Sequence, residues 1–159
     1  MEGFSKYAKE QYKLVRESRK VLLEYCRTIS PGDFIHENSS FGRGGSIRNL
    51  LTHIANIYEF WIAKHALGKA VIFTSYNSIQ TVNQVVDLFD TIDIVISEFI
   101  DLFENSQTQI DYEINGIKSN ATPLKLFTHV ITHEFHHKGQ ILSISRHLGY
   151  TPIDTDIIR

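Results

Sequence analysis

The sequence predicts an all-α protein, a four-helix bundle with a small β-hairpin excursion before the last helix. Four long segments carry apolar residues at alternating steps of three and four, the spacing of a buried helical face. Glycine and proline separate these segments. A shorter stretch before the fourth segment alternates in polarity and contains Asn115-Gly116, a strong hairpin-turn signal. With 159 residues in total, we expect a single domain over residues 1–159.

The first two helices have clear boundaries in the sequence. We expect the first from Phe4 to Ile29, where Ser30-Pro31-Gly32 stops it. Its predicted inner face has polar interruptions and comprises Phe4, Ala8, Gln11, Val15, Ser18, Leu22, Tyr25 and Ile29. A long loop is expected over residues 31–45, which include Gly32, Gly42, Gly44 and Gly45. Ser46 is placed to cap a second helix that runs to Leu67, with Gly68 as its C-cap.

The third helix has the most regular pattern and the fourth has the clearest start. Apolar residues keep the three-four rhythm without a break at Val82, Val85, Phe89, Ile92, Ile96, Phe99 and Phe103. The region 109–120 that follows is expected to form the hairpin. Thr122-Pro123 then opens the last helix, with Thr as N-cap and Pro in the first turn, and this helix ends at Leu148 before Gly149.

Composition excludes several classes of protein. With 16 basic and 18 acidic residues, the chain gives no electrostatic reason to expect nucleic acid or an anionic membrane as a partner. We expect neither a secretory leader nor a membrane span, because the sequence opens into charged residues and has no long apolar run. The single cysteine, Cys26, fits a buried core residue in a protein of the reducing cytoplasm.

Three histidines occupy positions that packing alone explains poorly. His133 and His137 are four residues apart on the predicted inner face of the last helix, so both imidazoles can reach one ion. His53 has the same kind of position on the second helix, between Leu50 and Ile57. Three nitrogens with a fourth position open to water or substrate are the pattern of catalytic rather than structural zinc.

Other interpretations of these residues stay open at this point. A single histidine on an apolar face is usually a hydrogen-bonded core residue. The string His133-Glu134-Phe135-His136-His137 also matches the zinc-peptidase pattern, in which the glutamate is the general base. However, Gln140 and Ser143 stand where the longer peptidase motif has Gly and His. If the protein is not such a peptidase, Glu134 either contacts and supports the metal-binding histidines or is exposed to solvent. Surface or hydrogen-bonding roles are expected for His65, His129, His136 and His147.

The two histidine blocks resemble those of the DinB/YfiT-like metalloenzymes. The resemblance rests on Leu50-Leu51-Thr52-His53 with Trp61 eight residues later, and on the run from His133 to Ile141. It implies a four-helix bundle, often dimeric, in which His53, His133 and His137 hold a divalent ion, zinc or nickel. Some members of that family are S-transferases or isomerases that use bacillithiol, mycothiol or a related thiol. The family name records induction by DNA damage and does not imply DNA binding.

These observations give a specific expectation for the function. We expect a metal-dependent enzyme that transfers a low-molecular-weight thiol to an electrophile, with the metal activating the thiol. A metal-dependent hydrolase and a noncatalytic metal-binding stress-response protein are the alternatives, and a fourth protein ligand would favour the last. Glu134, Gln140 and Tyr58 are candidates for residues that support the ligands. Gln11, Ser18 and Tyr25 are candidate pocket-liners.

A homodimer is also expected, because the last helix carries a second apolar stripe. A helix of a simple four-helix bundle needs only one apolar face, so something must cover the other. A neighbouring helix or the tail Tyr150–Arg159 could cover the stripe instead of a second copy. The stripe comprises Leu124, Phe127, Ile131, Phe135 and Leu142.

Overall fold

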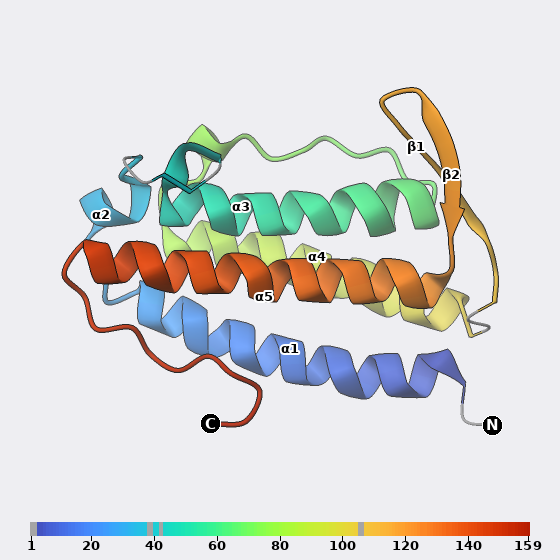
Figure 1. Ribbon diagram of the computed structural model, residues 1–159, viewed down its shortest axis with the longest axis horizontal. Coiled ribbons are helices and arrows are strands. Elements are labelled where there is room, and N and C mark those ends of the chain that lie inside the picture. Colours follow the sequence, from blue (N-terminus) through green and yellow to red (C-terminus); the bar gives the residue numbers. More distant parts are fainter. Residues whose placement is uncertain (1–2, 38–39, 42, 105–106) are drawn as a thin grey trace.

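The computed structural model describes residues 3–37, 40–41, 43–104 and 107–159. In this part of the chain, long helical segments lie side by side: α1 (Phe4–Cys26), α3 (Ile47–Tyr58) with its continuation η2 (Glu59–Ala66), α4 (Val82–Leu102) and α5 (Pro123–His147) (Figure 1). The hairpin of β1 (Ile110–Ile114) and β2 (Ile117–Ala121) stands at one end of the bundle, and the short helix α2 (Pro31–Ile35) stands at the other. The predicted bundle with a hairpin before the last helix is confirmed.

The order of the helices around the bundle determines which residues can meet. α1 packs against α4 and α5, and α3 packs against the same two helices. The face between α3 and α5 is therefore opposite the face between α1 and α4. None of the described helices combines the length and the apolar content needed to cross a bilayer.

Side-chain caps begin the helices where the sequence places them. The hydroxyl of Ser46 accepts a hydrogen bond from the Asn49 amide at 2.9 Å at the start of α3. Thr122 caps α5 in the same way, with Pro123 in the first turn. Thr81 and Gln84 form a reciprocal capping box at the start of α4. Each predicted start is confirmed to within one residue.

Two boundaries near the first helix differ from the prediction. α1 ends at Cys26, three residues before Ile29, and backbone turns follow it. The expected loop 31–45 contains α2 and the 3₁₀ turn η1 (Arg43–Gly45), because Ser30 caps the Asp33 amide and Pro31 starts a helical turn. Residues 38, 39 and Gly42 of that loop lie outside the described residues.

The second half of the second helix is wound more loosely than the sequence predicts. Residues Glu59–Ala66 form a π-helix, as in the bond from the Leu67 amide to the Ile62 carbonyl at 2.9 Å. The wider turn breaks the three-four rhythm, so Tyr58 and Ile62 are fully buried while Lys64 is exposed. Gly68, with a φ of 65°, closes this segment as expected of a C-cap glycine.

The hairpin is a two-residue turn between antiparallel strands. Ile114 pairs with Ile117, and the residues between them, Asn115 and Gly116, have φ angles of 52° and 78°. Two positive φ angles are the requirement of the type I′ turn that Asn-Gly favours. Tyr112 of β1 packs edge-on against Trp61 of η2, with the ring centroids 5.0 Å apart. The hairpin is thereby joined to the π-helical segment.

The second apolar stripe of the last helix is covered mainly within the monomer. Phe127 is fully buried, and its ring centroid lies 5.9 Å from that of Phe4 and 6.4 Å from that of Tyr12, both in α1. Ile131 is also buried, whereas Leu124 at the start of α5 is exposed. A neighbouring helix therefore covers the stripe, which no longer argues for a dimer.

The polar positions expected inside α1 are only partly right. Gln11 is exposed, and its neighbour Tyr12 occupies the buried position. Ser18 and Tyr25 are buried and bind α5, since Tyr25 donates to the Ser145 hydroxyl at 2.8 Å. Cys26 is fully buried, and burial raises the pKa of its thiol to about 12, so it is a core residue.

A buried ion pair joins α1 and α5 in the middle of the bundle. Arg19 donates two hydrogen bonds to the Glu134 carboxylate, one to each oxygen, both at 2.9 Å. Tyr58 donates to the same carboxylate at 2.6 Å from α3. Burial alone would raise the pKa of Glu134, but the charges of Arg19 and Lys138 lower it to about 2. Glu134 is therefore ionised, and the alternative that it is solvated is wrong because it is 0% exposed.

The ammonium of Lys138 extends this network to the C-terminal tail. It lies 3.2 Å from Glu134 and donates to the Ser18 hydroxyl at 2.9 Å. Ser18 in turn donates to the Thr155 carbonyl, which places the tail over α1 and α5. A backbone carbonyl of the C-terminal tail thus accepts the last hydrogen bond of this buried polar network.

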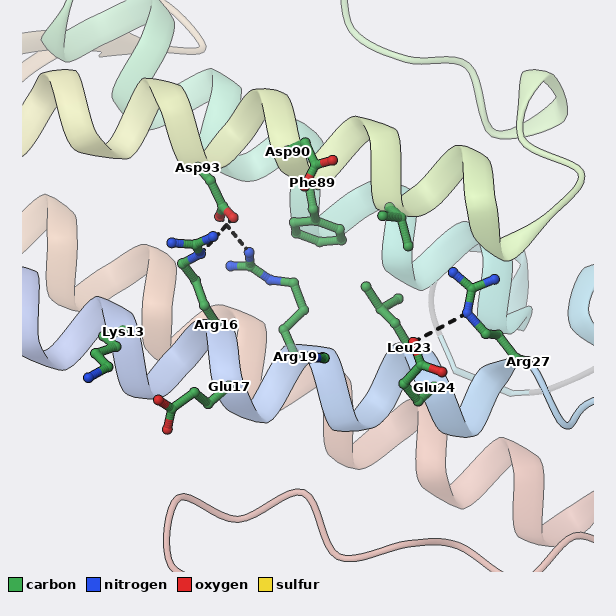
Figure 2. A pocket seen from close by; sticks show the side chains of 12 residues that line it. Lys13, Arg16, Glu17, Arg19, Leu23, Glu24, Arg27, Phe89, Asp90 and Asp93 are labelled. Carbon is green, nitrogen blue, oxygen red and sulfur yellow. Dashed lines mark hydrogen bonds and ion pairs between the residues drawn. The ribbon is translucent and has the colours of Figure 1, made fainter.

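Asp93 of α4 completes the network on the opposite side. Figure 2 shows Arg16 and Arg19 of α1 both directed at this carboxylate, with distances of 2.7 and 2.8 Å. Tyr12 also donates to Asp93 at 2.7 Å. Arg16, Arg19 and Asp93 line a groove of about 400 Å³ between α1 and α4. The guanidinium of Arg19 packs 4.3 Å from the Phe89 ring centroid at its base.

Removal of Arg19 should destabilise the fold far more than removal of its exposed neighbour. Arg19→Met leaves the Glu134 carboxylate short of its main counter-charge, and we expect a loss of roughly 3–5 kcal/mol in unfolding free energy. Arg16→Met removes a more exposed partner of Asp93 and should cost at most about 1 kcal/mol. Urea unfolding followed by circular dichroism measures both. Equal losses for the two variants would contradict this role of the buried pair.

Candidate metal centre

Three histidines from two adjacent helices meet between α3 and α5. His53 lies in the second turn of α3, and His133 and His137 lie one turn apart on α5. The Nε2 atom of His133 is 3.2 Å from that of His53 and 3.0 Å from that of His137. Among the described residues, these three form the group of potential ligands close enough to share one metal ion.

The distances between the nitrogens fit a common ion. Two ligands each about 2.0–2.1 Å from a zinc ion are about 2.9 Å apart at a right angle and about 3.4 Å apart at the tetrahedral angle. Both measured distances, 3.0 and 3.2 Å, fall inside that interval. The donor set also suits borderline metals, because imidazole nitrogen binds zinc and nickel well. The three residues could therefore hold a metal ion.

All three imidazoles are neutral at physiological pH, which a metal ligand must be. Burial lowers the pKa of His53 to about 4, with smaller contributions from the charges of Arg43 and His137. Burial, followed by the two neighbouring imidazoles, lowers the pKa of His133 to about 3. Burial also lowers the pKa of His137, although its hydrogen bond to Gln140 opposes the shift.

Gln140 fixes the orientation of one imidazole. Its Oε1 atom lies 2.6 Å from Nδ1 of His137, so a proton on Nδ1 is donated to the amide oxygen. In that tautomer Nε2 carries the lone pair and points at the other two histidines. Gln140 thus has the geometry of a residue that supports a ligand. Within the described part of the chain, the buried Nδ1 of His133 has no such partner.

Glu134 and Tyr58 contact each other and Arg19 instead of the histidines. Both are fully buried on the core side of their helices. The peptidase interpretation fails on this point, because its general base must face the metal and take up a proton. Glu134 is instead held ionised by Arg19 in the bundle interior.

The histidines also lie further from the bundle axis than the sequence pattern suggests. His133 and His137 are half-buried on the flank of α5 that faces α3, while Glu134 and Lys138 occupy its central positions. The apolar spacing predicted the histidines at the centre, because charged residues such as Glu134 and Lys138 are rarely fully buried. His133 and His137 thus keep partial exposure to solvent, whereas His53 is buried.

Two other histidines of α5, His129 and His136, pack beside the cluster without joining it. The His129 ring packs against Trp61 at 5.3 Å and against His133 at 6.0 Å between centroids. The rings of His136 and His137 are 4.9 Å apart. His147 is exposed and bonds to the Ser143 carbonyl. The contact of Trp61 with His129 was not foreseen, because it depends on the π-helical winding of η2.

The comparison with known families agrees with this geometry. The sequence model of the DinB family matches residues 4–159. The chain belongs to the DinB family. A curated relative, "Uncharacterized protein YizA" of Bacillus subtilis (strain 168), is 29% identical over 123 residues, which cover 73% of this chain and 75% of the relative. A three-histidine cluster in a DinB protein fits a metal-dependent function.

The metal-free protein should lose stability as the pH falls from about 7 toward 4. In the unfolded chain a histidine takes up its proton near pH 6.5. In the folded chain His53 and His133 do so only near pH 4 and pH 3. The unfolded state then binds more protons between these limits, so acid favours unfolding.

Thermal unfolding of chelator-treated protein across this pH range measures the effect. His133→Gln should reduce the slope of melting temperature against pH. His147→Gln, which changes an exposed histidine, should leave it unchanged. An identical slope in all three proteins would contradict the assignment.

Proposed function

We propose that this DinB protein is a metal-dependent enzyme that transfers a low-molecular-weight thiol to an electrophilic substrate. His53, His133 and His137 would hold one divalent ion, zinc or nickel. The observation that carries the proposal is the convergence of three neutral imidazole nitrogens at a half-buried position. No fourth protein ligand joins them among the described residues, which favours a catalytic over a structural site.

The chain's own residues supply binding and orientation for this chemistry. A divalent ion in such a site supplies Lewis acidity, which lowers the pKa of a thiol or water that it binds. Gln140 keeps the His137 ring in one tautomer through its 2.6 Å contact. The His129 ring packs against Trp61 and His133 on one side of the cluster. The substrate would approach from the side on which His133 and His137 are partly exposed.

Thiol transfer is favoured over hydrolysis by the lack of a free base. Water bound to a zinc ion still has a pKa of about 7 to 9, whereas a thiol has a pKa near 8.5 before it binds and a lower one on the ion. Glu134 is the carboxylate nearest to the ligands in sequence, and Arg19, Tyr58 and Lys138 already engage it. A hydrolase remains the alternative enzyme, and a noncatalytic metal-binding stress-response protein the alternative outside catalysis.

Each of the three histidines should be needed for metal binding. His53→Ala, His133→Ala and His137→Ala should each retain less than about a tenth of the metal, because two imidazoles hold a divalent ion weakly. His147→Ala is the matched control and should stay fully loaded. Elemental analysis after purification in zinc or nickel gives the ratio of metal to protein. Full occupancy in His53→Ala would remove that residue from the site.

Thiol addition to an electrophile should depend on the loaded site. Metal-loaded protein should accelerate the reaction, and the rate should persist below the pKa of the free thiol because the ion favours the thiolate. His137→Ala should lose the rate while its circular dichroism remains helical. If loaded protein neither binds thiols nor accelerates their addition to a broad electrophile panel, the hydrolase or binding-protein alternative takes over.

We also propose a cytoplasmic location. It fits the free, buried Cys26, because secreted proteins of this size often pair their cysteines.

A homodimer stays a prediction, and its support is now limited to exposed apolar residues such as Ile94 and Leu102 on α4. A solution mass of one chain at all concentrations would exclude the dimer.

A further inference from the structure

Gln140 lies between two imidazoles of α5 and contacts both through its side-chain amide. Its Oε1 atom is 2.6 Å from Nδ1 of His137, and its Nε2 atom is 3.3 Å from Nε2 of His136. Residues three and four apart on a helix share a face, so one glutamine can reach both rings. The rings also pack against each other, with centroids 4.9 Å apart and an interplanar angle of 68°. His136, Gln140 and His137 thus form a short hydrogen-bonded relay at the edge of the three-histidine cluster.

Glutamine alone does not determine which nitrogen of His137 carries the proton. One end of its amide accepts and the other donates, and a half-turn of the amide exchanges the two ends in nearly the same space. With the oxygen toward His137, Nδ1 carries the proton and Nε2 keeps its lone pair. With the amino group toward His137, Nδ1 must accept, the proton lies on Nε2, and Nε2 cannot bind an ion. A carboxylate or a backbone carbonyl in the same place would only accept and would leave no such choice.

The contact with His136 favours one of the two amide orientations. The amino group of Gln140 faces Nε2 of His136, which accepts the hydrogen bond when the proton of that ring is on Nδ1. With the amide turned over, both rings would have to exchange tautomers together. Nε2 of His137 would then direct an N–H group at Nε2 of His133, 3.0 Å away, where a shared ion would lie. The orientation seen in the structure is the one that suits metal binding.

Packing of the bundle gives no reason for a histidine at position 136. The side chain is exposed, and the group of potential ligands found among the described residues does not include it. Exposed side chains can be replaced at little cost to stability, so a role of His136 should be measurable at the site without loss of the fold.

We propose that His136 is a positioning residue of the three-histidine site and holds the Gln140 amide with its oxygen toward His137. Through this contact it keeps the proton of His137 on Nδ1 and leaves the lone pair of Nε2 free for an ion. His136 acts through Gln140 and is not itself a ligand. The inference rests on the proposed function, because the direction of this lone pair matters to a bound ion.

The tautomers of the metal-free protein test this role directly. Nitrogen-15 NMR of the imidazole rings, at about pH 8 where an ordinary imidazole is neutral, shows which ring nitrogen carries the proton. Native protein should hold His137 in the Nδ1–H form, as should His147→Phe, which changes an exposed histidine elsewhere on α5. His136→Phe keeps an aromatic ring beside His137 but removes the acceptor, so a substantial Nε2–H population should appear. A native ring without the Nδ1–H form, or the same single tautomer in His136→Phe, would overturn the inference.

Zinc affinity in two backgrounds separates positioning from packing. Competition with a chromophoric chelator should show that His136→Phe binds zinc about threefold to tenfold more weakly than native protein, the net effect of one hydrogen bond. Gln140→Glu places an acceptor-only carboxylate beside His137, so adding His136→Phe to it should not change the affinity. An equal loss in both backgrounds would assign the effect to packing and overturn the inference. Native protein that binds no zinc would defeat the proposed function, and the tautomers of the metal-free protein would still decide the role of His136.

Discussion

The ion pair between Arg19 and Glu134 determines how α5 is rotated in the bundle. Both groups are buried, and a buried charge without its partner costs several kcal/mol, so the helix settles where the pair forms. Each residue along an α-helix is turned by about 100° from the one before it. With Glu134 directed at α1, His133 and His137 must lie on a flank, and that flank faces α3. The orientation of the histidine cluster thus follows from a contact that does not touch it.

The same network keeps the core electrically balanced next to the site. Arg19 and Lys138 carry positive charge, Glu134 and Asp93 carry negative charge, and all four are linked by ion pairs. The buried groups of the network therefore carry both signs of charge, and Arg16 pairs with Asp93 from the exposed side. Burial, and none of these four charges, is the main cause of the lowered pKa of His53, His133 and His137. The ion pairs of the core and the neutral state of the histidines thus have different physical causes.

The sequence predicted the helices well and their inner faces less well. Caps such as Ser46 and Thr122 act through hydrogen bonds a few residues away, and local sequence contains all that they need. The contact of His53 with His133 and His137 could also be predicted. Three histidines on the inner faces of two helices are poorly explained by packing alone, and a shared metal ion is the main alternative. The central position of Glu134 could not be predicted, because its stability depends on Arg19 more than a hundred residues away.

The sequence did not predict features that depend on how tightly a helix is wound. A heptad template assumes a constant turn, so it assigned Gln11 to the core where the helix places Tyr12. It could not anticipate the π-helical turns of η2 or the contact of Trp61 with His129.

The change of winding after Tyr58 divides one continuous helix into two parts that can vary separately. His53 belongs to the α-helical part, and Trp61 belongs to the π-helical part. A π-helical segment holds one residue more than the α-helix that would span the same distance. Loss of a single residue from η2 would leave His53 in place and turn Trp61 by about 100° away from His129 and Tyr112. A one-residue change in length would therefore alter the aromatic contacts beside the cluster without altering the three histidines.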